Sequence, residues 1–253
     1  MTEPASGSTP GLAIVTGAAR NIGRAIALAL AHDGAPILLV AKSNRAGLEE
    51  TAKLVERAGG AALPHLADLT DEAAVAGMVA VALAWNGPPM ALVNNAALRK
   101  IQPFCEMTLS DWREVMAINL EAAFLCARAC LPHMVAAGGG RIVNIGGKSG
   151  HAGASERAHV IASKAALVGL TKALAVEFGA RGVSVNCVVP GEIDTVRGAS
   201  AGAIPDHPGG HATLIGRRGR PAEVARVVAS LCHPDAGYVT GQTVHVNGGG
   251  YLP

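Results

Sequence analysis

The sequence has few aromatic residues, little net charge and no paired cysteines. Only 3% of its 253 residues are aromatic although 50% are hydrophobic, so alanine, valine, leucine and the 32 glycines must supply most of the core. A formal net charge of +2, without runs of like charge, does not fit a nucleic-acid-binding or membrane-binding protein. The five cysteines have neither a CxxC motif nor paired spacing, which indicates buried thiols in a reducing compartment.

Export and membrane signals are also missing. The first ten residues, MTEPASGSTP, are polar and lack the basic start and apolar stretch of a signal peptide, so residues 1–10 are predicted to be a disordered tail. No apolar run in the sequence reaches the roughly 18 residues that a membrane span requires. We expect a cytoplasmic protein in which residues 11–253 form one domain, with no membrane, nucleic-acid or metal partner.

Short apolar runs alternate with helical patterns along the whole chain. The run at 12–17 ends in glycine, and residues 21–34 then show apolar residues at helical spacing. Further strands are predicted at 36–41, 62–70, 91–97, 140–147, 183–191 and 241–249, and further helices at 46–60, after Asp71, at 109–138, 157–182 and 221–235. Strands separated by helices imply parallel order with right-handed crossovers. The predicted fold class is α/β, a single-domain doubly wound, Rossmann-like parallel sheet of about seven strands with helices on both faces.

One long irregular stretch interrupts this alternation. Residues 197–220 are rich in glycine, alanine, proline and histidine, and a loop of that length in a compact fold is either a substrate lid or a disordered insertion.

The first strand runs into the glycine-rich stretch TGAARNIG. Gly17 permits a tight turn and Gly23 lets the next helix pack close to the strand, while free N–H groups at the start of that helix favour a pyrophosphate. Because this turn lies at the first strand-to-helix junction of an alternating chain, it indicates a dinucleotide site.

Several motifs together resemble the short-chain dehydrogenase/reductase family over roughly residues 10–252. TGAARNIG is similar to the family's TGxxxGxG, with Asn21 at the middle glycine. ADLT, NNAA, the Asn119 in MAINL, PGEIDT and TGQTVHVNGG follow in the family's order. The resemblance implies a nicotinamide cofactor and assigns contacts to it. Those residues are Gly17, Arg20, Asn21, Ile22, Gly23, Lys42, Ser43, Arg45, Asp68, Leu69, Asn95, Lys164, Pro190, Gly191, Ile193 and Thr195.

The end of the second strand bears on the choice of cofactor. NAD-preferring relatives carry an acidic residue there, which accepts hydrogen bonds from the ribose. This chain instead has Lys42, Ser43 and Arg45, and Arg20 in the glycine-rich turn could add a fork for a 2′-phosphate. The pattern predicts NADP (NADPH), although each cation alone could be an ordinary solvated charge.

The same resemblance exposes a gap in the catalytic set. In the family a tyrosine four residues before the lysine protonates the substrate, a serine holds the carbonyl and an asparagine maintains a water chain. Lys164 and Asn119 match the lysine and the asparagine, but Val160 stands at the tyrosine position and Gly147 at the serine position. Neither of the two tyrosines lies near them in the sequence.

Other residues could replace the missing groups. His159, adjacent to Val160, and His151, in the loop after the fifth strand, are candidate acids, although both could be packing residues. Lys148 could hold an anionic group of the substrate or polarise its carbonyl. Arg99 and Lys100 approach the pocket mouth in the family fold, so the cations together suggest an acidic substrate.

Three functions remain open. The first is an atypical NADP(H)-dependent oxidoreductase that retains Lys164 and Asn119 and acts on a small carbonyl or conjugated substrate, with an anionic group on it suggested by the cations above. Alternatively, the chain is a non-redox enzyme that uses histidine or lysine acid–base chemistry, or a catalytically silent NADP(H)-binding regulatory module. Apolar stripes such as AAFLCARACL and the family resemblance together predict a homotetramer.

Overall fold

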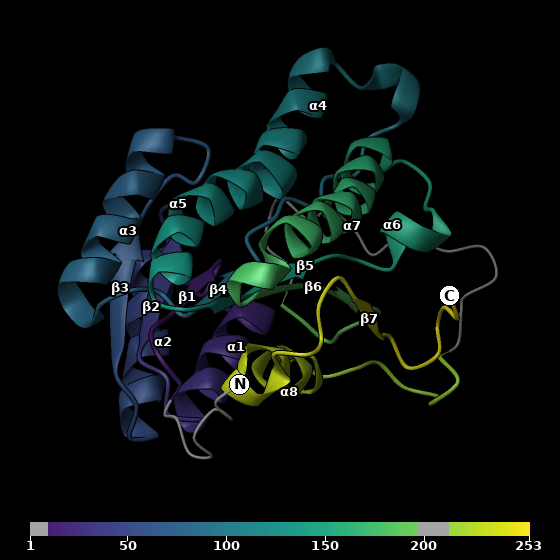
Figure 1. The fold of residues 1–253 in the computed structure, drawn as a ribbon. Helices are drawn as coiled ribbons and strands as arrows, with labels where there is room; N and C mark the ends of the chain where they lie inside the picture. Colours follow the sequence, from purple (N-terminus) through teal and green to yellow (C-terminus); the bar gives the residue numbers. More distant parts are fainter. Residues whose placement is uncertain (1–9, 197–212) are drawn as a thin grey trace.

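The strands form one parallel seven-stranded sheet in the computed structural model, which describes residues 10–196 and 213–253. The strand order is β3-β2-β1-β4-β5-β6-β7 (Figure 1). The strands are β1 (Ala13–Thr16), β2 (Ile37–Ala41), β3 (Ala62–Leu66), β4 (Ala91–Asn94), β5 (Gly140–Ile145), β6 (Val183–Pro190) and β7 (Thr243–Val246). The doubly wound α/β fold predicted from the sequence is confirmed.

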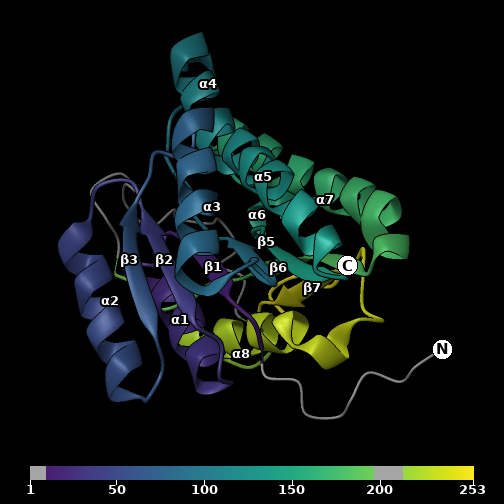
Figure 2. The ribbon, with the colours of Figure 1, turned by 60° about the vertical axis from the view of Figure 1, so that its left-hand side comes forward.

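Helices cover both faces of this sheet (Figure 2). One apolar core lies between the sheet and α1, α2 and α8, and a second lies between the sheet and α3, α5 and α7. The helices are α1 (Asn21–His32), α2 (Arg45–Arg57), α3 (Glu72–Asn86), α4 (Leu109–Met116), α5 (Ala122–Ala136), α6 (Ser149–Ala152), α7 (Ala158–Phe178) and α8 (Pro221–Cys232). Strands buried on both faces explain the continuous apolar runs of the sequence.

The predicted single helix over 109–138 is wrong in one respect. A π-helical turn, Ala117–Glu121, separates α4 from α5, and Asn119 lies in that turn. The extra residue of a π-turn aims a side chain that a regular helix would rotate away, and such turns are frequent at functional sites.

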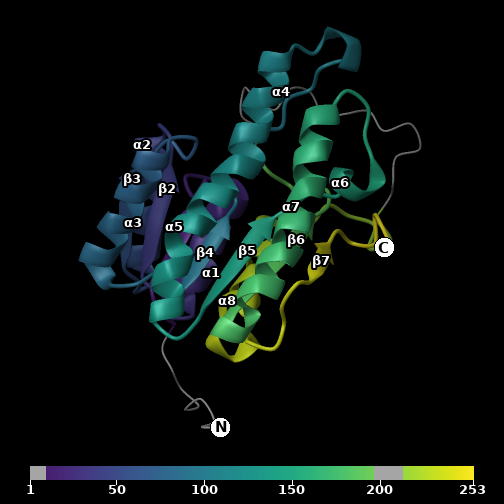
Figure 3. The same ribbon diagram turned by 45° about the horizontal axis from the view of Figure 1, so that its top comes forward.

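Two helical stretches, Leu109–Ala136 and Ala158–Arg181, have the length and apolar composition of a membrane span. Figure 3 shows α5 and α7 lying along the same face of the sheet, where both contribute to its core. This packing buries 44% of the most apolar window of the first stretch and 39% of that of the second. Of the five cysteines, Cys105 is exposed, so the expectation that all are buried is wrong for this one; the other four are buried.

The strand order reverses between β1 and β4, and ligands of open α/β sheets bind beside the carboxyl ends of the strands at such a reversal. The loops that follow β1, β4, β5 and β6 therefore frame the candidate site. Of the expected tail and lid, residues 1–9 and 197–212 lie outside the described residues. The last part of the expected lid, 213–220, forms turns and a bridge between Gly219 and Ile193.

Candidate active site

The glycine-rich turn after β1 has the geometry that its sequence predicts. Gly17 has φ +65°, and a Cβ atom there would lie 2.8 Å from Asn95 Nδ2. A Cβ at Gly23 would lie 2.2 Å from the Gly17 carbonyl oxygen, a distance that no side chain tolerates. Asn95 closes the turn by donating from Nδ2 to the carbonyls of Thr16, at 2.8 Å, and Gly17, at 3.2 Å. Glycine is therefore required at both positions, because the turn packs closely against Asn95.

Asn21, in place of the family's middle glycine, adopts the left-handed conformation with φ +53°. Its Nδ2 donates to the Val196 carbonyl at 2.8 Å, and its Oδ1 accepts from the Val196 N–H at 3.0 Å. The side chain thus joins the glycine-rich turn to the segment that follows β6.

At the end of β2, Lys42 pairs with Asp68 at 2.7 Å. Hydrogen bonds from Lys42 and Thr70 lower the pKa of Asp68 to about 2. Ser43, Arg45 and Arg20, the other donors expected for a 2′-phosphate, are all exposed at this end of the sheet. The pairing brings two predicted adenosine contacts together and offsets part of the Lys42 charge.

Lys164 lies inside the protein on α7. Its Nζ donates to the Ile145 carbonyl at 2.6 Å, and the residue is only 6% exposed. Burial lowers the pKa of this ammonium to about 8, since the charged form loses its hydration; the Cys187 thiol acts in the opposite direction and Arg99 in the same one. The group can therefore change its charge near neutral pH.

Asn119 uses its side-chain amide to connect three elements. Its Oδ1 accepts from the Leu98 N–H at 2.7 Å, and its Nδ2 donates to the Leu98 carbonyl and to Ser163 Oγ, at 3.1 and 3.0 Å. Ser163 in turn donates to the Val160 carbonyl at 2.8 Å. Hydrogen bonds thus connect the π-turn to the loop after β4 and to α7, the helix that carries Lys164.

Both positions at which the family's hydroxyls are missing adjoin this helix. Val160 is buried, with 3% exposure. A Cβ at Gly147 would lie 3.8 Å from Lys164 Cγ, and no other contact within 4 Å is found for it among the described residues beyond its chain neighbours. Gly147 therefore leaves room for a side chain directly beside Lys164.

The candidate replacements differ in their surroundings. His159 is fully buried, and burial lowers its pKa, although the Arg157 backbone and Asp111 act the other way. Lys148 is paired with Glu192 at 3.3 Å. Lys100 pairs with Glu114 and lies 4.0 Å from Asp111. The expectation of uncompensated cations that attract an acidic substrate is not supported at Lys148 and Lys100, because each faces a carboxylate.

Tyr251 lies near the candidate site, although it is far from Val160 and Gly147 in the sequence. The rings of His151, His245 and Tyr251 form a cluster, with centroids 4.7 Å apart for the two histidines and 5.8 Å apart for His151 and Tyr251. Burial lowers the pKa of both histidines. The loop after β5 and the C-terminal segment therefore form one side of the site, where Gly250 lies close to Lys148.

The segment after β6 is held in a fixed position beside the sheet. Ile193 forms a parallel bridge with Gly219, and the Asp194 N–H donates to the Gly219 carbonyl at 2.7 Å. A Cβ at Gly191 would lie 2.6 Å from Asn247 Cβ, so the chain passes close to the C-terminal segment there. The predicted nicotinamide contacts Ile193 and Thr195 belong to this segment, as does the predicted cofactor contact Gly191, while Pro190, also predicted to contact the cofactor, is the last residue of β6.

Two buried polar side chains were missed by sequence reasoning. Asn94 Nδ2 donates to Asn144 Oδ1 at 2.9 Å, and Asn144 Nδ2 donates to Thr171 Oγ1 at 2.9 Å. These bonds connect β4 and β5 to α7 and so fix the helix that carries Lys164. Asparagines inside the apolar runs ALVN and RIVNI were the signal.

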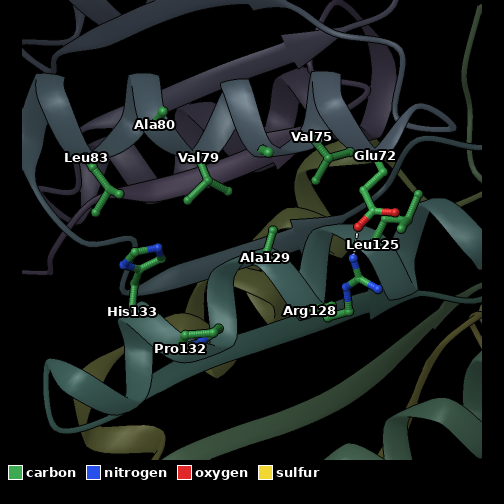
Figure 4. Close-up of a pocket in the computed structure, with 11 residues that line it drawn as sticks. Glu72, Val75, Val79, Ala80, Leu83, Leu125, Arg128, Ala129, Pro132 and His133 are labelled. Atoms are coloured by element: carbon green, nitrogen blue, oxygen red, sulfur yellow. Dashed lines mark hydrogen bonds and ion pairs between the residues drawn. The ribbon is translucent and has the colours of Figure 1, made fainter.

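A groove of about 420 Å³ lies away from these loops, between α3 and α5 (Figure 4). Its floor is apolar, and an ion pair between Glu72 and Arg128 lies at one end. Among the described residues, no group of three or more histidine, cysteine, aspartate or glutamate side chains could hold a metal ion.

Comparison with known proteins agrees with this geometry. The family model described as enoyl-(acyl carrier protein) reductase matches residues 17–250. The 3-oxoacyl-acyl-carrier-protein reductase FabG of Pseudomonas aeruginosa is 37% identical over 250 residues, covering 95% of this chain and 97% of the relative. The acetoacetyl-CoA reductase of Rhizobium meliloti is 38% identical over 248 residues, covering 95% and 98% of the two chains.

Solved structures show the same fold. A mutant of a Serratia marcescens short-chain dehydrogenase/reductase superposes with a TM-score of 0.87 at 34% identity, covering 99% of this chain and 100% of the other. A Beutenbergia cavernae protein described as an NAD(P)-dependent gluconate 5-dehydrogenase, with bound NADP, has a TM-score of 0.85 at 36% identity, covering 94% and 95%. The chain therefore belongs to the short-chain dehydrogenase/reductase family, whose members are oxidoreductases that bind a nicotinamide cofactor.

Proposed function

We propose that the protein is an NADP(H)-dependent oxidoreductase that acts on a small carbonyl or conjugated substrate without a tyrosine acid. The proposal is supported by the sequence, which matches the family's pattern at the glycine-rich turn, Lys164 and Asn119 and departs from it at Val160 and Gly147. Gly17 and Gly23 form the closely packed glycine-rich turn. Lys164 and Asn119 stand at the family's lysine and asparagine positions. Val160 and Gly147 stand where the family has its tyrosine acid and its carbonyl-holding serine.

The cofactor fits the residues that are present. Gly17 and Gly23 let the turn pack closely against Asn95, and the N–H groups beside Ile22 begin a helix, where a pyrophosphate is favoured. Asp68 and Leu69 would contact the adenine. No carboxylate stands at the end of β2, so Ser43 and Arg45, with Arg20 from the turn, favour a 2′-phosphate over a free ribose hydroxyl.

When bound, the cofactor supplies a hydride to the substrate or accepts one from it. Lys164 would orient the nicotinamide ribose through its ammonium, while the aliphatic part of its side chain borders the space at Gly147. The Asn119 side chain is fully used in holding Leu98 and Ser163, so we propose that water is held at its main-chain carbonyl in the π-turn. The proton would then come from water or from His151, because His159 is fully buried.

The substrate is proposed to be a carbonyl or conjugated compound of the kind that relatives reduce. The two relatives above are named for 3-oxoacyl and acetoacetyl thioesters. The carboxylate partners of Lys148 and Lys100 leave an anionic substrate without support at these lysines. Hydride transfer to a conjugated C=C, in which protonation follows later, depends less on a positioned acid than carbonyl reduction does.

A spectrophotometric screen tests this proposal. NADPH oxidation is followed at 340 nm with purified protein and a panel of acetoacetyl-CoA, simple ketones, enones and imines. Turnover of at least one compound that is lost on omission of NADPH would support it. Tight NADPH binding without turnover across the panel would instead indicate a binding module, and substrate conversion without nucleotide would indicate a non-redox enzyme.

We also propose that the protein is a cytoplasmic homotetramer. Phe124 on α5 is 44% exposed, and the apolar groove beside this helix is lined by Val75, Val79 and Leu125. A second copy packed on this face would cover both. Light scattering after size-exclusion chromatography should give four times the 25.4 kDa chain mass.

A further inference from the structure

Asn21 contacts a residue 175 positions later in the chain, and the contact uses both halves of its amide. The donor Nδ2 and the acceptor Oδ1 face the carbonyl and the N–H of the same residue, Val196, at 2.8 and 3.0 Å. Only an amide side chain presents a donor and an acceptor together in this way. Aspartate at this position could accept but not donate, and glycine could do neither.

The backbone at Asn21 favours glycine, so the asparagine is not there for conformational reasons. Its φ of +53° is a region that glycine enters without cost and that asparagine tolerates better than most other residues. Asparagine suits this backbone conformation less well than glycine does, but it adds a side-chain amide that can form hydrogen bonds. The two hydrogen bonds to Val196 are the contacts that this side chain makes among the described residues.

The contact between Asn21 and Val196 crosses the edge of the sheet at which a dinucleotide binds. Asn21 follows β1 and Val196 follows β6, and these strands are separated in the sheet by β4 and β5. At the usual strand spacing the two strands lie about 14 Å apart. The two segments meet only because both extend beyond the carboxyl ends of β4 and β5. That edge is the crevice in which the dinucleotide of a doubly wound sheet binds.

The Val196 end of the contact is anchored independently. Ile193 bridges to Gly219, and Asp194 donates to the Gly219 carbonyl. The segment between Ile193 and Val196 is therefore held at one end by Gly219 and at the other by Asn21, with Thr195 between them. Movement of Val196 away from the glycine-rich turn requires both Asn21 bonds to break.

We infer that Asn21 is a positioning residue whose amide straps the segment 193–196 across the nucleotide crevice and thereby slows release of the cofactor. The inference rests on the proposed function, since it requires NADP(H) to bind in that crevice. The strap links the phosphate end of the site to the segment that carries the predicted nicotinamide contacts Ile193 and Thr195. A chain with glycine at this position has no such link.

The test compares wild type with Asn21→Gly and Asn21→Asp. Glycine suits the left-handed backbone, so Asn21→Gly is expected to fold with an unchanged or higher melting temperature. Loss of two exposed hydrogen bonds should raise the NADPH dissociation rate about tenfold in stopped-flow fluorescence, and Asn21→Asp should raise it at least as much, because it loses the donor and places a negative charge in the phosphate turn. Thr108→Ala, which removes the helix cap of α4, serves as a control with a stability cost but no change in release.

A second readout uses the free protein. Hydrogen exchange at the Val196 amide should be protected in wild type and faster in Asn21→Gly, because the Oδ1 acceptor is gone. Equal exchange at Val196, or equal NADPH release rates in wild type and Asn21→Gly, would overturn the strap while leaving the proposed function intact. A wild-type protein that binds no NADPH would overturn the proposed function itself, and with it the strap as a cofactor device.

Discussion

Gly147 lies directly beside Lys164. A Cβ atom at position 147 would be 3.8 Å from Lys164 Cγ, the one contact found for it within 4 Å among the described residues beyond its chain neighbours. The structure therefore leaves room for a Cβ atom at position 147, next to Lys164.

Restoring both hydroxyls should accordingly create an ordinary carbonyl reductase. Gly147→Ser and Val160→Tyr together are expected to raise kcat for ketone reduction by about 10²-fold or more, the contribution typical of a positioned acid. NADPH oxidation at 340 nm with acetoacetyl-CoA measures the change. The two single variants show whether the tyrosine alone is enough to raise kcat. If the double variant binds NADPH normally but shows no increase in kcat, residues other than these two also prevent carbonyl reduction.

Lys164→Met should separate binding from stability. Removal of a buried ammonium is expected to leave the melting temperature unchanged or higher, because methionine fills a similar volume without the cost of burying charge. NADPH affinity should nevertheless fall about tenfold through loss of the ribose contact. Calorimetric melting and titration of the same preparation check both. Undiminished affinity and rate would remove Lys164 from the cofactor site.

The turnover rate should fall as pH rises through about 8. Burial lowers the pKa of Lys164 from 10.5 to about 8, so the charged form exists below that value and is lost above it. The proposed contact of Lys164 with the nicotinamide ribose would lose its charge over the same range. The pH dependence of kcat/KM measures this effect. A profile that stays flat from pH 7 to 9.5 would show that the ammonium does not act on the reaction.

Stability should decline on the acid side because of buried histidines. Burial lowers the pKa of His159, His151 and His245, so each binds its proton more weakly in the folded state than in the unfolded state. The free energy of unfolding is therefore unaffected by these histidines above about pH 6.5 and decreases as pH falls below it, because the unfolded chain binds the protons first. Melting temperatures from pH 7.5 to 5 give the slope. His159→Leu should flatten it, and a slope equal to that of wild type would exclude His159 as a contributor.

Cofactor choice should depend on Arg45. Arg45→Ala is expected to weaken NADPH binding about tenfold, since an exposed arginine next to a 2′-phosphate is worth roughly that factor, while NADH binding stays the same. The ratio of the two dissociation constants is the measurement. Lys42→Ala should have the smaller effect, because Asp68 already pairs with that lysine. A parallel loss for both cofactors would mean that Arg45 does not read the phosphate.

Local rules predicted the features that local geometry decides. The glycines of the first turn and the alternation of strands and helices follow from neighbouring residues. The pairs Lys42–Asp68 and Lys148–Glu192 could not be predicted, because they join loops that are adjacent only through the strand order. Tyr251 was missed for the same reason: β7 delivers the C-terminal segment to the loop that holds His151.

The π-turn at Asn119 lay beyond sequence reasoning for a different reason. The apolar pattern continues through it, so nothing in the residues of MAINL marks the extra residue in the turn. The turn is stabilised by tertiary hydrogen bonds to Leu98 and Ser163, partners that only the folded chain supplies.

Titration calorimetry of the folded wild-type protein with NADPH and NADH tests the central claim most directly, namely that the nucleotide site survives the loss of the two catalytic hydroxyls. The account predicts saturable heat with NADPH and at least tenfold weaker binding of NADH, a difference of about 1.4 kcal/mol. Equal affinities would contradict the NADP assignment, and no heat from either nucleotide would contradict the account as a whole.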